Sequence, residues 1–160
     1  MPVSLLTLAL YQPDIPQNTG TLLRTCACLD VAAAIIEPAG FPVSDRHFRR
    51  SGMDYLDDLD LRRHVSFEAF EAWRAEGRRQ HGGHRLVLLS TRASLPYAEF
   101  AFEPDDILML GRESAGVPDA VHNTADVRLL VPMRPGMRSL NVAVAASMVL
   151  GEALRQLRRQ

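Results

Sequence analysis

Residues with the potential for chemistry lie in three loops, each of which follows an apolar stretch of the chain. These loops span 11–20, 110–118 and 131–141, and the first is followed by Arg24. An arginine is suited to hold a phosphate or a ribose oxygen, glycines let a backbone approach a ligand closely, and the N-terminus of a helix offers N–H groups to an anion. The first loop is therefore a candidate site for an anion, and the second allows a ligand to approach its backbone closely.

Each loop, taken alone, also has an ordinary structural interpretation. Asn18 is a residue type that caps helices, and Arg24 could be a solvated helix residue. The 110–118 segment could be a plain turn, because its glycines match neither a Walker loop nor a dinucleotide-binding fingerprint. The third loop offers Ser139 and Asn141 as caps for the next helix and could be a simple connection. Local chemistry alone therefore leaves the function open.

The elements that must position these loops alternate between short apolar segments and amphipathic ones. We expect strands over 4–11, 32–36, 61–65, 85–90, 106–111 and 127–131. We expect helices from an Asn18 or Thr19 cap to about Leu29, over 44–51, from a Ser66 cap to about Arg79, and over 142–157. The last helix has a clear apolar stripe, which could cover a partner chain or the protein's own core. This alternation predicts an α/β fold, a mostly parallel sheet with helices on both faces, whose ligands bind at the carboxyl ends of strands.

The length, charge, apolar content and cysteines of the chain limit the class of protein to which it can belong. With 160 residues, it is expected to form one domain over 1–160 with a core of its own. Its net charge is −1, and all 18 of its basic residues are arginines, which occur in local clusters. No apolar run is long enough for a membrane span and no signal peptide begins the sequence, so we expect a cytoplasmic protein without a membrane partner. Cys26 and Cys28 point to different faces of a helix and predict neither a disulfide nor a metal site.

Taken together, in this order and spacing, the three loops resemble the signature motifs of the SpoU branch of the SPOUT methyltransferases. The matching residues are Asn18-Thr19-Gly20 with Arg24, then Gly111, Glu113 and Gly116, and finally Pro132, Ser139 and Asn141. The residues between the motifs resemble the small subfamily that methylates the ribose of the tRNA wobble nucleotide. They are Tyr11, Pro13, Ile15-Pro16, Glu37-Pro38, Gly40-Phe41, Arg49-Arg50 and 52–55. The resemblance covers essentially the whole chain.

The resemblance implies a fold, a reaction and partners. The family fold is α/β with a C-terminal deep trefoil knot, which general rules of chain topology would not predict. The implied enzyme transfers a methyl group from S-adenosylmethionine to the 2′-oxygen of nucleotide 34 of tRNA. That nucleotide is a cytidine or a 5-substituted uridine, and leucine isoacceptors are the expected substrates. The enzyme would act as a homodimer and would need no metal.

The resemblance also assigns roles to individual residues. Arg24 would act by holding a substrate phosphate or oxyanion rather than as a base, because arginine stays protonated. The residues expected to shape the catalytic site with it are Asn18, Glu113, Ser139 and Asn141. The residues expected to bind S-adenosylmethionine are Leu89, Gly111, Val131, Ser139 and Leu140. The residues expected to contact RNA are Arg46, Arg49, Arg50 and Arg138, and this contact would weaken with salt.

The sequence departs from the family pattern at three places. Asp30 stands where relatives commonly have glycine, Val117 stands where they have leucine, and the run after Asn141 lacks two polar side chains. The alternatives are therefore a methyltransferase of another tRNA position or of ribosomal RNA, and a non-catalytic knotted RNA-binding protein. A nucleotide-binding regulatory domain is a third. The polar residues retained in all three motifs favour an enzyme over a pure binder.

Overall fold

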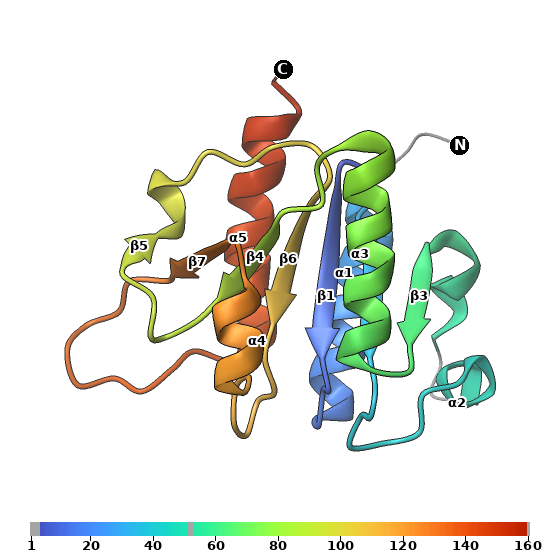
Figure 1. Ribbon diagram of the computed structural model, residues 1–160. Coiled ribbons are helices and arrows are strands. Elements are labelled where there is room, and N and C mark those ends of the chain that lie inside the picture. Colours follow the sequence, from blue (N-terminus) through green and yellow to red (C-terminus); the bar gives the residue numbers. More distant parts are fainter. Residues whose placement is uncertain (1–3, 51–52, 160) are drawn as a thin grey trace.

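The computed structural model describes residues 4–50 and 53–159, which form one sheet between two layers of helices (Figure 1). The strands are β1 (Leu6–Tyr11), β2 (Ala32–Ile36), β3 (Leu61–His64), β4 (Leu86–Leu89), β5 (Leu95–Pro96), β6 (Asp106–Leu110) and β7 (Val127–Leu130). The α-helices are α1 (Pro16–Leu29), α2 (Asp45–Arg50), α3 (Phe67–His81), α4 (Asp119–Thr124) and α5 (Val142–Leu157). Two 3-10 helices are η1 (Asp54–Asp58) and η2 (Tyr97–Glu99). The sequence does not predict β5, α4, η1 or η2, because such short segments carry too little periodicity.

The strands pair in parallel throughout the sheet, in the order β3-β2-β1-β6-β4-β7-β5. The prediction of an α/β fold with a mostly parallel sheet is confirmed. Strand β6 lies beside β1, with Leu108 in register with Leu8, although most of the chain's length separates them. Because parallel strands end at the same edge, the loops after β1, β4, β6 and β7 meet there. This carboxyl edge of the sheet carries all three motif loops.

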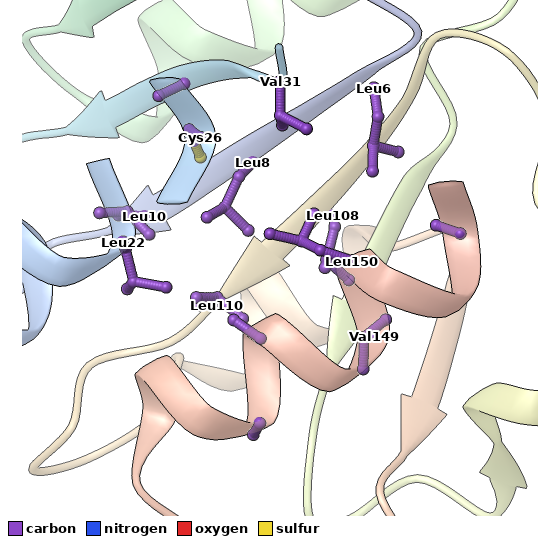
Figure 2. Packing of buried hydrophobic residues seen from close by; sticks show 14 of the residues in the cluster. Leu6, Leu8, Leu10, Leu22, Cys26, Val31, Leu108, Leu110, Val149 and Leu150 are labelled. Atoms are coloured by element: carbon purple, nitrogen blue, oxygen red, sulfur yellow. The ribbon is translucent and has the colours of Figure 1, made fainter. Parts of the chain in front are cut away.

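Each face of the sheet buries an apolar cluster. Helices α1 and α5 cover one face, and α3 and α4 cover the other (Figure 1). Side chains alternate along each strand, so Leu8 belongs to the first cluster and Ala9 to the second. Figure 2 shows Leu150 of α5 beside Leu108 of β6 in the first cluster. The apolar stripe of α5 therefore covers the protein's own core, which decides between the two alternatives that the sequence leaves open.

Helix α1 begins earlier than its sequence signals predict. It starts at Pro16, with Ile15 as the residue before it, and no side chain caps its first turn. The prediction that Asn18 or Thr19 caps this helix is wrong, because proline at the first helical position already has a helical φ and removes one of the N–H groups that would stay unpaired there. Asn18 thus lies within the first turn, and the N–H of Gly20 lies inside the helix rather than free for an anion.

Other helix ends agree with the sequence. Ser66 caps α3, where its hydroxyl accepts a hydrogen bond from the Ala69 N–H at 3.1 Å, and Asn141 caps α5. Asp30 ends α1 with a φ of 57°, in the left-handed region that favours glycine. This conformation accounts for the glycine that the family resemblance predicts at this place. Among the described residues, no helix combines the length and apolar character that crossing a membrane requires.

Candidate active site

A cavity of about 900 Å³ opens at the carboxyl edge of the sheet. Its walls come from the segments that follow β4, β6 and β7 and from the first turns of α1 and α5. Among the residues that line it are Ile15, Asn18, Leu89, Gly111, Glu113, Val131, Ser139, Leu140 and Asn141. The structure thus brings the three motif loops together in one cavity, which we call the first cavity.

The residues expected to bind the cofactor all line the first cavity. They are Leu89, Gly111, Val131, Ser139 and Leu140. Leu89 is the last residue of β4, as expected, whereas β7 ends at Leu130, one residue before Val131. Aliphatic side chains beside strand ends give an apolar wall with backbone polar groups at its margin, which suits a heterocyclic ligand. That these residues bind the cofactor stays a prediction.

The loop after β6 folds tightly back on itself. The Arg112 N–H donates to the Gly116 carbonyl oxygen at 3.0 Å, and the Gly116 N–H donates to the Arg112 carbonyl oxygen at 2.9 Å. A Cβ atom on Gly111 would lie 2.7 Å from the carbonyl carbon of Gly116, which is too close for any side chain. Gly116 itself has a φ of 62°. Both motif glycines are therefore required by the shape of the loop.

A pair of carboxyl side chains joins the first motif loop to the second. The Asp14 N–H donates to Oε2 of Glu113 at 3.1 Å, and the Glu113 N–H donates to Oδ1 of Asp14 at 3.2 Å. The Ser114 hydroxyl also donates to Asp14. Burial and a hydrogen bond between the two carboxyl groups raise the pKa of Glu113, and that bond between the carboxyl groups lowers the pKa of Asp14. When the pair holds one proton, Glu113 therefore carries it.

A pair of asparagines joins the first motif loop to the third. Nδ2 of Asn141 donates to Oδ1 of Asn18 at 3.1 Å. Oδ1 of Asn141 accepts hydrogen bonds from the Ala143 N–H at 2.8 Å and from the Val144 N–H at 3.3 Å. One amide group thus caps α5 and also contacts α1. Together with the carboxyl pair, it makes the first loop the common partner of the other two.

Arg24 lies apart from the first cavity. It lines a second cavity of about 510 Å³ with Gly20 and Tyr55, and its guanidinium carbon lies 5.6 Å from the centroid of the Tyr55 ring. At 3.6 residues per turn, Arg24 and Asn18 project roughly 120° apart around α1. Within one chain, the structure brings the other four predicted catalytic residues together but places Arg24 elsewhere.

The arginines predicted to contact RNA lie on two segments. Arg46 and Arg50 are exposed on α2, and Arg138 is exposed in the third motif loop. The side chain of Arg49 lies outside the described residues. The exposed positions leave these side chains accessible to an RNA phosphate, and their RNA contacts stay a prediction.

The remaining sequence expectations concern metals and thiols. In the described part of the chain, no group of three or more His, Cys, Asp or Glu side chains is placed to hold a metal ion. Cys26 is a buried free thiol and Cys28 an exposed one. The prediction that the two side chains point to different faces of α1 is thus confirmed.

Comparison with known proteins identifies the family. Residues 5–151 match the SpoU rRNA Methylase family. The chain belongs to the SpoU methylase family. A Beijerinckia indica protein named tRNA (cytidine(34)-2′-O)-methyltransferase is 73% identical over 150 residues, which cover 94% of this chain and 91% of that protein. An Escherichia coli K12 protein of the same name is 36% identical over 156 residues, which cover 96% of this chain and 94% of that protein.

Solved structures agree with the family assignment. A structure from work on the 2′-OH methylation of C/U34 on tRNA has a TM-score of 0.84 at 39% identity, with 97% of both chains covered. The SpoU methyltransferase AviRb from Streptomyces viridochromogenes, in complex with AdoMet, has a TM-score of 0.86 at 27% identity. That match covers 98% of this chain and 62% of the AviRb chain. The predicted resemblance to the SpoU branch is therefore confirmed.

Sequence reasoning misses the role of Asp14, which joins two of the motif loops. It lies in the first motif loop, but its partner Glu113 is 99 positions away in the sequence. From sequence alone, an acidic residue in a loop is expected to be exposed to solvent. The available signal is weaker: two carboxyl groups in two motif loops that follow strands of one parallel sheet.

Proposed function

We propose that this protein transfers a methyl group from S-adenosylmethionine to the 2′-oxygen of the wobble nucleotide of tRNA, a cytidine or 5-substituted uridine at position 34. The observation that carries the proposal is the first cavity, which all three motif loops line at the carboxyl edge of the sheet. The names of the relatives at 73% and 36% identity support the substrate and its position. The expected preference for leucine isoacceptors rests on the family resemblance.

The first cavity fits S-adenosylmethionine. Its volume of about 900 Å³ lies within the usual range for small-molecule sites. Leu89, Val131 and Leu140 offer apolar walls for an adenine ring, and the tight loop after Gly111 brings backbone polar groups within reach. When bound, S-adenosylmethionine supplies an activated methyl group. AdoMet in the structure of AviRb supports this choice of cofactor.

A ribose hydroxyl is a weak nucleophile at neutral pH. The site must therefore position this hydroxyl and allow its proton to pass to an acceptor. The amide and hydroxyl groups of the first cavity are not bases at this pH. Glu113 is already engaged with the Asp14 N–H. From the family resemblance, we propose that Arg24 holds the substrate phosphate or a developing oxyanion, which suits a side chain that stays protonated. A phosphate oxygen or a water molecule then accepts the proton.

An apolar surface beside the first cavity supports the homodimer. Its side chains are those of Ile15, Leu140, Val144 and Met148, which are 39%, 41%, 53% and 42% exposed. Ile15 and Leu140 line the cavity, and Val144 and Met148 lie one turn apart on the face of α5 that the core does not cover. Neighbouring exposed apolar side chains mark interaction surfaces. Because Arg24 does not line the first cavity of its own chain, we propose that the homodimer supplies the arginine from the partner chain.

Mixing two inactive variants tests this arrangement. Arg24→Ala removes the arginine, and Ser139→Ala alters the cavity wall. If Arg24 acts across the dimer, each mixed dimer has one complete site, and a random mixture recovers about a quarter of the activity. If Arg24 acts within its own chain, both sites of a mixed dimer are damaged. No recovery from a mixture that contains mixed dimers would therefore refute catalysis across the interface.

We also propose that the whole chain forms one domain whose C-terminal part is threaded through a trefoil knot. The single sheet supports one domain, and the strand order supports the knot, because β6 lies between β1 and β4, and β7 lies between β4 and β5, although both follow β4 and β5 in the sequence. An experimental structure in which the C-terminal segment does not pass through a loop of the same chain would refute the knot. The cytoplasm is the proposed location, because the proposed substrate is tRNA.

Methyl transfer to tRNA tests the function directly. Purified protein is incubated with labelled S-adenosylmethionine and with tRNA from cells that lack wobble-ribose methylation, and the label is mapped. We expect label on the 2′-oxygen of nucleotide 34, and none with Arg24→Ala. Label at another tRNA position or on ribosomal RNA only would favour that alternative substrate. Cofactor and RNA binding without transfer to any RNA would favour a non-catalytic binder.

A further inference from the structure

The second cavity is built mainly by residues that the proposed chemistry does not use. It has a volume of about 510 Å³ and lies between α1, α2 and η1. Its residues include Gln17, Arg24, Phe41, Phe48, Met53 and Tyr55. No described residue lines both cavities, yet Gln17 lines the second and its neighbour Asn18 lines the first. The first turn of α1 is thus the wall between them.

Tyr55 is a fixed aromatic side chain in this cavity. Its hydroxyl donates to the carbonyl oxygen of Gly20 at 2.9 Å. Burial raises the pKa of Tyr55, so the phenol keeps the proton that makes this bond. A Cβ atom on Gly20 would lie 2.9 Å from Cε of Met53, so the glycine lets the segment around η1 pack closely on α1. The ring is therefore held in place before any ligand binds.

Arg24 offers an available positive charge beside this ring. Its guanidinium lies over Tyr55 and makes no hydrogen bond or ion pair with the side chains that the structure describes. Helix α2, which contributes Phe48 to the cavity, also carries the exposed Arg46 and Arg50. A guanidinium suits a phosphate and an aromatic ring suits a base, and this combination is typical of sites for single-stranded RNA.

We propose that the second cavity receives an unstacked base of the tRNA anticodon loop, with the base stacked on Tyr55. The inference rests on the proposed function and extends it, because it names the residues that hold the substrate base. The base is that of the methylated nucleotide, since Arg24 is assigned to the phosphate or ribose oxygen of that nucleotide. Phe41 and Phe48 supply the apolar walls that keep water from the stacked base.

A double-mutant cycle between protein and RNA tests the stacking. Dissociation constants are measured for the wild type and Tyr55→Leu, each with an intact anticodon stem-loop RNA and with the same RNA abasic at nucleotide 34. We expect Tyr55→Leu to weaken binding of the intact RNA by about 5- to 100-fold, the range of one base–aromatic stack. The abasic RNA should bind the wild type correspondingly more weakly. Tyr55→Leu should then cause little further loss with the abasic RNA, because both changes remove the same contact.

Two control variants separate stacking from damage to the fold. Tyr55→Phe keeps the aromatic ring and loses only the hydrogen bond to Gly20. Its dissociation constants for the intact and the abasic RNA should therefore match those of the wild type. Tyr97→Leu removes a half-buried tyrosine that packs against the core from η2, and it should leave RNA affinity unchanged. A normal affinity of Tyr55→Leu for S-adenosylmethionine would show that the first cavity is intact.

Three outcomes would overturn the inference. The first is additive losses in the cycle, and the second is a loss of binding in Tyr55→Phe equal to that in Tyr55→Leu. The third is a Tyr55→Leu protein whose oligomeric state in solution differs from that of the wild type while its RNA affinity does not. A protein partner, and not a base, would then fill the cavity. Additive losses in a protein that still methylates nucleotide 34 would refute this inference alone. A coupled cycle without methylation of any tRNA would instead refute the proposed function.

Discussion

Replacing Asn141 by alanine should weaken both the fold and the site. The change removes the cap of α5, which is worth about 1 kcal/mol with a range of roughly 0.5–2. It also removes the 3.1 Å hydrogen bond to Asn18, which adds about 0.5–1.5 kcal/mol. The free energy of unfolding should therefore fall by about 1.5–2.5 kcal/mol. In a domain of this size, each kcal/mol lowers Tm by about 2–4 °C, so thermal unfolding should show a decrease of roughly 3–10 °C.

Ser66→Ala is the matched control for this prediction. Ser66 caps α3 through one bond to the Ala69 N–H and does not line the first cavity. Its loss should cost about 1 kcal/mol, or roughly 2–4 °C in Tm, and leave S-adenosylmethionine affinity unchanged in titration calorimetry. Asn141→Ala should weaken that affinity, because Asn141 lines the cavity. Equal decreases in Tm for the two variants, with equal cofactor affinity, would refute the reasoning that Asn141 joins α5 to the site.

Three further predictions concern other contacts of the chain. Gly111→Ala should weaken S-adenosylmethionine binding measured by calorimetry, because the added Cβ atom would lie 2.7 Å from backbone in the facing half of the loop; an unchanged affinity would show that the loop yields at no cost. Glu113→Gln should become more stable relative to the wild type as pH rises above 4.5, the ordinary carboxyl value, in denaturant titrations at several pH values. The reason is that a raised pKa favours the native state only while Glu113 is protonated, and this contribution is lost when the carboxyl ionises beside Asp14; a difference in stability that does not change with pH would contradict it. Thiol reagents should label exposed Cys28 and leave buried Cys26 unmodified in the native protein, since burial raises the pKa of Cys26 to about 12; mass spectrometry of digests distinguishes the two, and equal labelling would mean that α1 opens readily.

The sequence predicts the parts of this protein that depend on local patterns. Apolar runs identify most strands within one or two residues, and the stripe from 142 to 157 identifies α5. The start of α1 is the exception, because two signals compete within four residues. Asn18 favours a cap, while Pro16 favours the first helical turn, and the proline decides the outcome.

The candidate site is predicted less completely, because its contacts join distant parts of the chain. The family motifs identify the polar residues of the first cavity, although they do not indicate that Asn18 bonds to Asn141 or that Asp14 bonds to Glu113. Arg24 lines the second cavity and Asn18 lines the first, because the two residues lie on different sides of α1. Spacing along α1 places Arg24 and Asn18 on different sides of the helix, but it does not specify which segments of the chain pack against each side.

The hydrogen bonds that join the motif loops also have a consequence for biosynthesis. The first loop is made early, but its partners Glu113 and Asn141 lie 99 and 123 positions later in the sequence. A ribosome must therefore reach Glu113 before the first bond can form and Asn141 before the second, and pairings this distant fold slowly. A chain released before α5 is made would lack the Asn141 end of the site. Competence to bind the cofactor would thus require synthesis through Asn141, and chains terminated before it would not compete for S-adenosylmethionine.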